Sequence, residues 1–154
     1  MGKSMRRFAS LGGAAAVVGS SLLFDGAVAN ALPYDNTDPG ATGCANTGRV
    51  VRSAPMRNRY NGDPQGTVYL FYSSGCRTVW AKMSTGAPGC VPGADWCGSA
   101  TVHRNSDGYE LRCYTPSGRS SCSTRQLNDA NVTSFAEAQF DNGPWSYYGK
   151  TGSY

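Results

Sequence analysis

Apolar and polar residues alternate in short runs along the second two-thirds of the chain, and turn-forming residues separate these runs. The clearest run covers residues 67–72, which are rich in the β-branched and aromatic side chains that favour strands. A turn over 73–75 follows, and residues 76–83 then alternate again. The two runs and their turn predict an antiparallel β-hairpin.

Two more runs predict a second hairpin. Residues 101–104 and 109–114 flank a turn whose Asp107-Gly108 pair suits a tight connection. Residues 50–56 are a further expected strand, ahead of the first hairpin.

The C-terminal third is less clear from its pattern. Residues 132–140 fit a short helix or a strand, and the turn residues on both sides favour the strand. Residues 145–154 predict the last strand. The predicted fold class is therefore all-β, a small disulfide-stabilised barrel or sandwich of antiparallel strands.

The start of the chain has the composition of an export signal. Basic residues come first, an apolar stretch over 11–24 follows, and small residues suited to cleavage come next. This pattern predicts a signal peptide over 1–31 and a secreted, extracellular product. A retained membrane anchor is the alternative, but the apolar stretch is shorter than the roughly 18 residues that a spanning helix needs.

The remainder divides into an arm and one domain. Residues 32–43 have no period and predict an irregular arm, whereas 44–154 predict a single β-rich domain. The formal net charge of the full chain is only +4, so charge indicates no nucleic-acid partner. We expect a monomer without a membrane span after cleavage.

An even number of cysteines in an exported chain indicates disulfides, and we expect three. A zinc site is excluded by the single histidine and the lack of a Cys-x-x-Cys pair, and no cofactor is expected. The glycine- and proline-rich stretch 86–98 reads as a loop closed by its own disulfide, but sequence leaves the connectivity open. The six cysteines are Cys44, Cys76, Cys90, Cys97, Cys113 and Cys122.

Residues 66–82 (GTVYLFYSSGCRTVWAK) carry a recognisable motif, Tyr-Ser-x-x-Cys-Arg-x-x-Trp-Ala, over 72–81. The motif resembles the signature of a secreted family of high-GC Gram-positive bacteria that is catalogued only as a domain of unknown function. The resemblance covers about 43–83 and, more loosely, 100–154. It implies an exported, β-rich, disulfide-bonded module and supplies no catalytic residue.

The chain departs from the commonest form of that family in two respects. It lacks a second early cysteine near Cys44, and it has an insertion that carries Cys90 and Cys97. A pairing of Cys44 with Cys76 is therefore an inference about this chain and is not inherited from the family.

Candidate chemistry is sparse. His103, Glu110 and Arg112 lie on the two arms of the second predicted hairpin, and they are the residue types with which a small secreted ribonuclease performs acid/base catalysis and binds phosphate. The structural alternative is three polar residues on a solvated strand face. A serine hydrolase is excluded by the absence of Gly-x-Ser-x-Gly.

The stretch between Cys113 and Cys122 is a second functional alternative. A disulfide would hold Arg119 in a constrained turn, as a protease inhibitor requires for a trypsin-like pocket. An ordinary stapled hairpin explains the same residues.

Aromatic residues suggest a binding role. Arg77 and Trp80 are types enriched at binding hot spots, although Trp80 could equally pack inside the fold. Trp145 and Tyr148 could form an aromatic platform, with Tyr147 on the face of the last strand opposite to Tyr148. The preferred hypothesis is a noncatalytic extracellular or cell-surface-associated binding module, whose partner is a cell-wall or extracellular glycan or protein.

Overall fold

The computed structural model describes residues 33–85 and 96–154. It confirms the all-β class. The described elements are a short 3₁₀ helix, η1 (Cys44–Thr47), and the strands β1 (Gly48–Asn58), β2 (Pro64–Ser73), β3 (Thr78–Ser84), β4 (Trp96–Arg104), β5 (Glu110–Pro116), β6 (Ser121–Ser123), β7 (Leu127–Asn128), β8 (Ser134–Asn142) and β9 (Trp145–Lys150).

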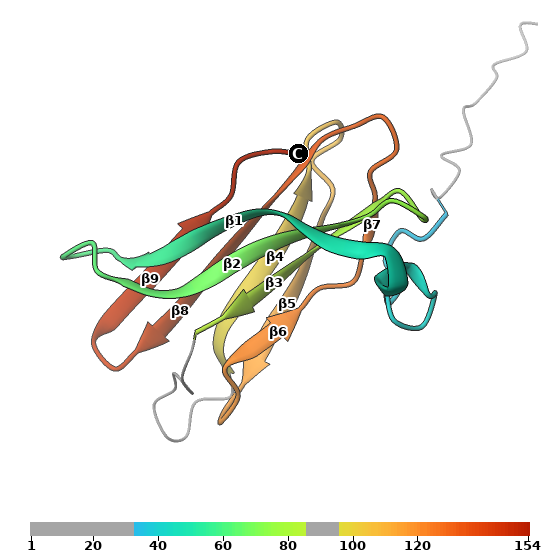
Figure 1. The fold of residues 1–154 in the computed structure, drawn as a ribbon. Helices are drawn as coiled ribbons and strands as arrows, with labels where there is room; N and C mark the ends of the chain where they lie inside the picture. The colour runs from blue at the N-terminus through green and yellow to red at the C-terminus, as the bar shows by residue number, and fades with distance from the viewer. Residues whose placement is uncertain (1–32, 86–95) are drawn as a thin grey trace, which may run out of the picture. The chain divides into compact units, whose positions relative to one another are not determined.

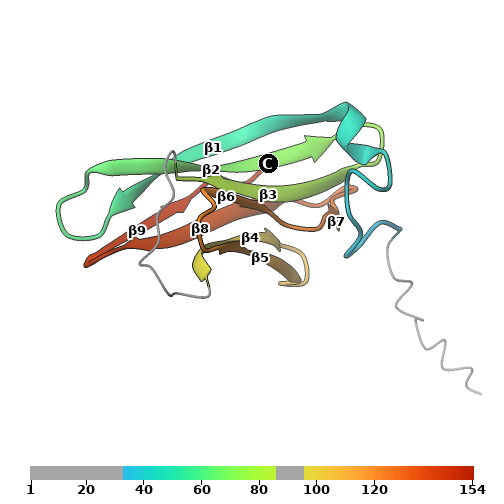
Figure 2. The same ribbon diagram turned by 90° about the horizontal axis from the view of Figure 1, so that it is seen from below.

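The strands form one nine-stranded antiparallel sheet in the order β5-β4-β8-β9-β1-β2-β3-β6, and β7 pairs with β3 (Figure 1). The sheet curls so that β1, β2 and β3 lie over β4 and β5 (Figure 2). Its two end strands, β5 and β6, are linked by a disulfide-bonded hairpin. The result is a nearly closed barrel with one face of every strand turned inward.

Both predicted hairpins are present. Strands β2 and β3 pair from Thr67 opposite Ser84 to Ser73 opposite Thr78, and β4 pairs with β5 around the predicted turn. The strand β3 starts at Thr78, two residues later than the alternation starts, because Arg77 adopts a left-handed conformation (φ 56°) inside the turn. A left-handed residue cannot continue a pleated strand.

The predicted loop over 86–98 ends too late. Residues 86–95 are outside the described part, but β4 already starts at Trp96, and Gly98 lies within it beside an irregularity in the pairing with β5. A Cβ on Gly98 would lie 2.6 Å from the Gln139 carbonyl oxygen, so glycine is required where the backbones approach closely. The glycine that suggested a loop in the sequence therefore serves strand packing.

The ambiguous segment near residue 132 is a strand, β8, as the turn residues favoured. The last strand, β9, ends at Lys150, earlier than expected. The remaining residues still bind the sheet, because the backbone groups of Tyr154 and Ser134 form two hydrogen bonds with each other.

The barrel interior is filled by inward side chains from seven strands. Phe140 and Tyr147 stack with ring centroids 4.6 Å apart, so the Tyr147 face of β9 enters the core. Burial of these apolar side chains is the main stabilising contribution to the fold. The core residues are Met56, Val68, Leu70, Val79, Ala81, Met83, Ala100, Val102, Leu127, Ala136, Ala138, Phe140 and Tyr147.

Two disulfides fasten the described part of the barrel. Cys44–Cys76 joins η1 to the β2–β3 turn, and Cys113–Cys122 joins β5 to β6. The first spans 32 residues, and a closed loop of tens of residues adds about 3–4 kcal/mol by restricting the unfolded chain. The expected Cys90–Cys97 bridge lies outside the described residues, since Cys90 does.

The irregular segment before η1 is bonded to the barrel. Thr37 pairs with Gln126 in an isolated bridge, and the Gln126 side-chain amide donates hydrogen bonds to the hydroxyls of Thr37 and Thr42. The Gln126 amide oxygen accepts a hydrogen bond of 2.7 Å from Thr78. A fully buried glutamine thus has its polar atoms satisfied, as a buried amide requires.

Arg104 fixes the same segment from the other side. Its guanidinium donates to both carboxylate oxygens of Asp35 at 2.9 Å and to those of Asp107 at 2.9 and 2.7 Å. It also donates to the Asn128 carbonyl at 3.1 Å. The hydrogen bonds with Arg104 lower the pKa of Asp107 to about 2, and those with Asp107 and Asp35 raise the pKa of Arg104.

A buried carboxyl, Asp129, lies near this cluster. The Ser134 hydroxyl donates to it at 2.6 Å, and Asp129 is almost inaccessible to solvent. Burial raises the pKa of Asp129 to about 6, although the Ser134 hydrogen bond and the Arg104 charge oppose the shift.

Among residues 33–85 and 96–154, no helix has the length and apolar composition to cross a bilayer.

Candidate functional site

The outer face of β5, β4, β8 and β9 carries a regular array of polar side chains, because alternate residues of each strand point away from the core. Direct cross-strand pairing sets which side chains are neighbours. In strand order, the three rows of this polar face are Tyr114, Ser99, Gln139 and Tyr148; then Arg112, Thr101, Glu137 and Lys150; then Glu110, His103 and Phe135.

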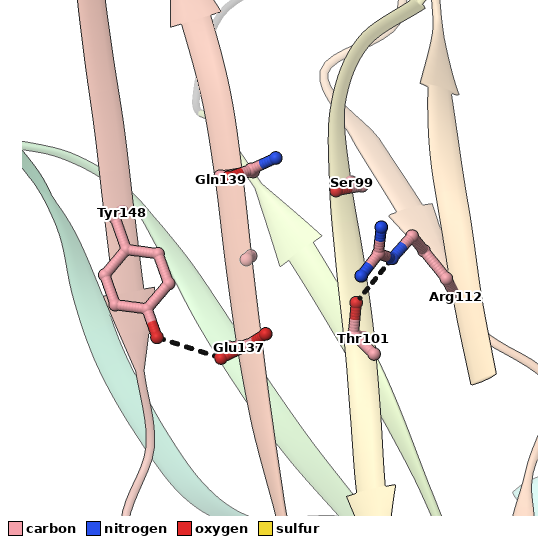
Figure 3. Close-up of a pocket in the computed structure, with 7 residues that line it drawn as sticks. Ser99, Thr101, Arg112, Glu137, Gln139 and Tyr148 are labelled. Atoms are coloured by element: carbon pink, nitrogen blue, oxygen red, sulfur yellow. Dashed lines mark hydrogen bonds between the residues drawn. The ribbon is translucent and has the colours of Figure 1, made fainter. Parts of the chain in front are cut away.

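A small hollow opens in the middle of the polar face (Figure 3). Ser99 and Thr101 on β4 are short and almost fully buried, whereas Arg112, Gln139 and Tyr148 on the flanking strands are longer. The hollow has a volume of about 60 Å³. On a scale where one water needs about 10–15 Å³, it holds about four to six waters. It therefore fits one small polar group of a larger ligand.

Arg112 projects over the hollow with most of its donors unused (Figure 3). Its Nε donates a hydrogen bond of 3.0 Å to the buried Thr101 hydroxyl, which fixes the plane of the guanidinium. The Glu110 carboxylate is 3.8 Å from Nη2, which is too far for a hydrogen bond. The two terminal nitrogens of Arg112 thus have no hydrogen-bond acceptor among the described residues.

Glu137 places a carboxylate at the rim of the hollow, and each of its oxygens has a close neighbour. Oε2 accepts a hydrogen bond of 2.9 Å from the Tyr148 hydroxyl, drawn as a dashed line in Figure 3. Oε1 lies 3.1 Å from His103 Nε2. Burial, and next the hydrogen bond with Glu137, raises the pKa of Tyr148, so this hydroxyl remains a donor at neutral pH.

Ser99 lies at the floor of the hollow with only 4% of its surface exposed. Its hydroxyl has no hydrogen-bond partner among the described residues. The hydroxyl is open to the hollow, where solvent or a ligand can bind it. The Gln139 amide extends from β8 toward Ser99 (Figure 3), so the hollow offers a hydroxyl, an amide and a guanidinium together.

The sequence-predicted trio His103, Glu110 and Arg112 is brought together on the polar face. His103 Nδ1 lies 3.1 Å from a Glu110 oxygen, and the imidazole stacks on Phe135 with centroids 4.5 Å apart. At Nε2 the distance to Glu137 is short, but the atom is buried and the direction is unsuitable for a hydrogen bond. Both ring nitrogens of His103 face carboxylates, so neither nitrogen points into open solvent where a substrate would bind.

Four polar members of the site escaped the sequence prediction: Ser99, Thr101, Glu137 and Gln139. They come from the pairing of β4 with β8, which joins segments far apart in the chain. The alternation of 134–140 gave the signal for two of them, because it puts Glu137 and Gln139 on the same face. Nothing local indicated which strand would lie beside them.

The other predicted binding residues lie elsewhere. Arg77 is exposed in the β2–β3 turn and donates a 2.8 Å hydrogen bond to the Asn131 side chain. Trp80 is buried, stacked on Phe71, and a Cβ on Gly48 would clash with its ring. Trp80 thus packs beneath the start of β1 and has a structural role, whereas Arg77 is exposed.

Trp145 and Tyr148 do not form one platform. Trp145 is 46% exposed and makes an edge-on contact with Tyr60 from the β1–β2 turn, with centroids 6.0 Å apart. Tyr148 instead belongs to the hollow, and the Arg59 guanidinium covers its ring at 5.2 Å. The two aromatic residues leave β9 on opposite faces.

The stretch between Cys113 and Cys122 forms a tight hairpin turn. The Arg119 backbone amide donates to the Pro116 carbonyl at 3.1 Å, and Gly118 has a positive φ of 74°. Arg119 is exposed.

In the described segments, no group of three or more His, Cys, Asp or Glu side chains is arranged to hold a metal ion.

A family described as a protein of unknown function, DUF2690, matches residues 32–138. The chain belongs to this family. The match includes β4, β5 and the start of β8, so it contains Ser99, Arg112 and Glu137 but neither Gln139 nor Tyr148.

A relative of this chain is the uncharacterized protein YjfA of Bacillus subtilis. The two are 29% identical over 129 residues, which are 79% of this chain and 80% of YjfA. No solved structure matches this chain significantly. The comparisons therefore give a family without an assigned activity.

Proposed function

We propose that this protein is an exported, noncatalytic binding module that holds an anionic group of an extracellular polymer in the hollow of the polar face. One observation carries the proposal. Arg112 is held in a fixed orientation by Thr101, while its terminal nitrogens and the Ser99 hydroxyl face the hollow without a hydrogen-bond acceptor or donor among the described residues, and Glu110 lies 3.8 Å from Nη2.

The chemistry of the hollow suits an oxyanion. A guanidinium presents two parallel N–H donors that match a carboxylate, sulfate or phosphate, and such charge-assisted hydrogen bonds are the stronger ones. The acidic neighbours are Glu137, whose Oε2 accepts the Tyr148 hydrogen bond, and Glu110, which lies 3.8 Å from Nη2 of Arg112. The volume of about 60 Å³ admits one such group, while drug-sized ligands need about 300 Å³ or more.

Several features support an extracellular setting. Disulfides persist in oxidising compartments, and the described part of the chain has two. The leader-like residues 1–31 agree with export. We propose a monomer that associates with the cell wall or the extracellular matrix through acidic glycan and does not bind nucleic acid.

Binding assays with three soluble polymers test the proposal: polygalacturonate for carboxylates, dextran sulfate for sulfates and polyglycerol phosphate for phosphodiesters. Isothermal titration should show binding of at least one, and Arg112→Gln should weaken it about tenfold or more, as loss of a bidentate charged pair does. Ser99→Ala should weaken the same interaction by a smaller factor.

Arg119→Gln is the matched control, because Arg119 is also exposed but lies in the β5–β6 turn outside the hollow. It should bind like the wild type. If none of the polymers binds, or if both arginine variants lose equal affinity, the hollow is not the specific anion site. Dextran, which is uncharged, should not bind.

Ribonuclease activity is a second candidate, favoured by the gathering of His103, Glu110 and Arg112 on one face. Glu110 would act as base, His103 as acid and Arg112 would bind the phosphate. Against this role, both imidazole nitrogens face carboxylates and Nε2 is buried. Cleavage of a labelled RNA by the wild type, and its loss in Glu110→Gln and His103→Ala, would establish the activity. Intact RNA after prolonged incubation would dismiss it.

A further inference from the structure

A second hollow lies on the other side of the barrel, on the outer face of β1, β2, β3 and β6. Its volume is about 260 Å³, several times that of the polar hollow. Its lining combines two aromatic rings, one valine, two serines and one lysine. We call it the aromatic groove, formed by Val50, Tyr69, Phe71, Lys82, Ser84 and Ser121.

The rings of the aromatic groove are held rigidly. Phe71 stacks on the buried Trp80 with centroids 5.3 Å apart and planes 10° apart. Tyr69 lies 6.4 Å from Phe71 on the same strand face. Because Trp80 supports Phe71 from one side, little side-chain entropy is lost when a ligand packs against these rings.

The polar groups of the groove have a single sign of charge. Lys82 is exposed and forms no ion pair with any described residue. None of the six lining residues is acidic, and Ser84, Ser121 and Tyr69 contribute hydroxyls. The groove thus offers aromatic faces, hydroxyls and one open cation.

We propose that the aromatic groove is a second binding site, which takes a sugar ring that bears a carboxylate. The apolar C–H face of the ring packs against Phe71 and Tyr69, its hydroxyls bind Ser84 and Ser121, and its carboxylate pairs with Lys82. A few polar groups around an apolar wall are the usual composition of a ligand site. The site is independent of the polar hollow.

Charge complementarity selects this occupant over a second copy of the chain. In a symmetric dimer through this face, the two Lys82 side chains would approach each other, and none of the described residues that line the groove has a carboxylate to pair with them. Like charges brought together at an interface are unfavourable. An acidic glycan supplies the missing negative charge and also uses the hydroxyls.

Chemical-shift mapping tests the proposal with the ¹⁵N-labelled protein purified from the medium of an exporting host. The probes are trigalacturonate and its uncharged methyl ester. Trigalacturonate should shift the amide signals of Tyr69, Phe71 and Lys82 in a saturable manner. The methyl ester should bind about tenfold or more weakly, because the Lys82 pair is lost.

Two variants sharpen the test. Lys82→Gln should lower the affinity at the groove about tenfold, whereas Lys150→Gln, an exposed lysine that lines neither hollow, should leave it unchanged. Tyr69→Leu keeps apolar bulk but removes the ring, and it should also weaken binding. Unshifted groove signals, or equal affinity for the acid and the ester, would refute the site.

The same spectra keep the two proposals apart. The amides of Ser99, Thr101 and Arg112 report on the polar hollow, and those of Tyr69 and Lys82 on the groove. Shifts at the groove alone leave this inference standing while the hollow fails, and shifts at the hollow alone do the reverse. Groove signals that change on dilution without a ligand would reveal self-association and overturn the glycan assignment.

Discussion

Two arginines on paired strands, Arg104 of β4 and Arg112 of β5, have opposite environments. Arg104 is 5% exposed, and its donors bind Asp35, Asp107 and the Asn128 carbonyl. Arg112 is 42% exposed, only its Nε has a hydrogen-bond acceptor in the described part of the chain, and Glu110 lies 3.8 Å from Nη2. The same residue type therefore has a structural role at position 104 and is available for ligand binding at position 112. The number of guanidinium donors that protein acceptors already bind distinguishes the two roles.

The cause of the difference lies in strand alternation. His103 and Arg104 are adjacent, so their side chains leave β4 on opposite faces. The outward face shares its surface with Glu110 and Arg112, whereas Arg104 meets the segment before η1 and the β4–β5 turn. Two consecutive residues of β4 thus belong to different sites: His103 to the candidate ligand site and Arg104 to the ion pairs with Asp35 and Asp107.

The largest effect should come from breaking the Arg104 cluster. Arg104→Leu leaves the Asn128 carbonyl without its partner and the Asp35 carboxylate with only the Asn128 backbone amide, and removal of one member of a buried pair costs about 3–5 kcal/mol. Urea unfolding followed by circular dichroism measures the loss. The exposed Arg119→Leu should change the free energy of unfolding by no more than about 0.5 kcal/mol. If the two variants lost equal free energy of unfolding, the hydrogen bonds of the Arg104 guanidinium would not contribute to stability.

Asp129→Asn should act in the opposite direction and depend on pH. Between about pH 4 and 6 the unfolded chain releases the Asp129 proton while the folded chain, with a pKa of about 6, retains it, so stability falls as the pH rises. Above pH 6 the cost is roughly 2–3 kcal/mol. Asparagine still accepts the Ser134 hydrogen bond and carries no charge. The variant should be more stable than the wild type at pH 7 and nearly equal at pH 3.5 in thermal unfolding.

Tyr148→Phe should have a smaller effect on stability and a clear one on the polar hollow. It removes the 2.9 Å hydrogen bond to Glu137, which costs about 1 kcal/mol. It also leaves Glu137 a freer anion at the rim, so the affinity for polygalacturonate should fall. If the affinity is unchanged, the hydrogen bond between Tyr148 and Glu137 does not contribute to anion binding.

Arg112→Ala should have the smallest effect on folding. Because Arg112 is exposed and makes one hydrogen bond to a side chain, its removal should cost about 0.5 kcal/mol or less. Anion binding should be lost in the same variant. A stability loss comparable to that of Arg104→Leu would show that Arg112 is another structural arginine.

The predictable part of the candidate site came from one hairpin. His103, Glu110 and Arg112 lie on its two arms, and the Asp107-Gly108 turn sets which residues face each other. Ser99 and Thr101 share the face of His103 by alternation, but their importance depends on being short beside long neighbours. Glu137 and Gln139 could not be assigned, because an alternating strand does not specify which strand it joins.

Sequence alone determined the local structure: alternation fixed the strand character of β2, β3, β4 and β5, and turn residues fixed the hairpins. The short spacing of Cys113 and Cys122 across one turn likewise agreed with their bridge. Only the tertiary structure decided that β8 lies between β4 and β9, and that Asp35 reaches Arg104. Hairpins depend on neighbours in the chain, whereas these long-range contacts depend on burying the whole core at once, which no local pattern encodes.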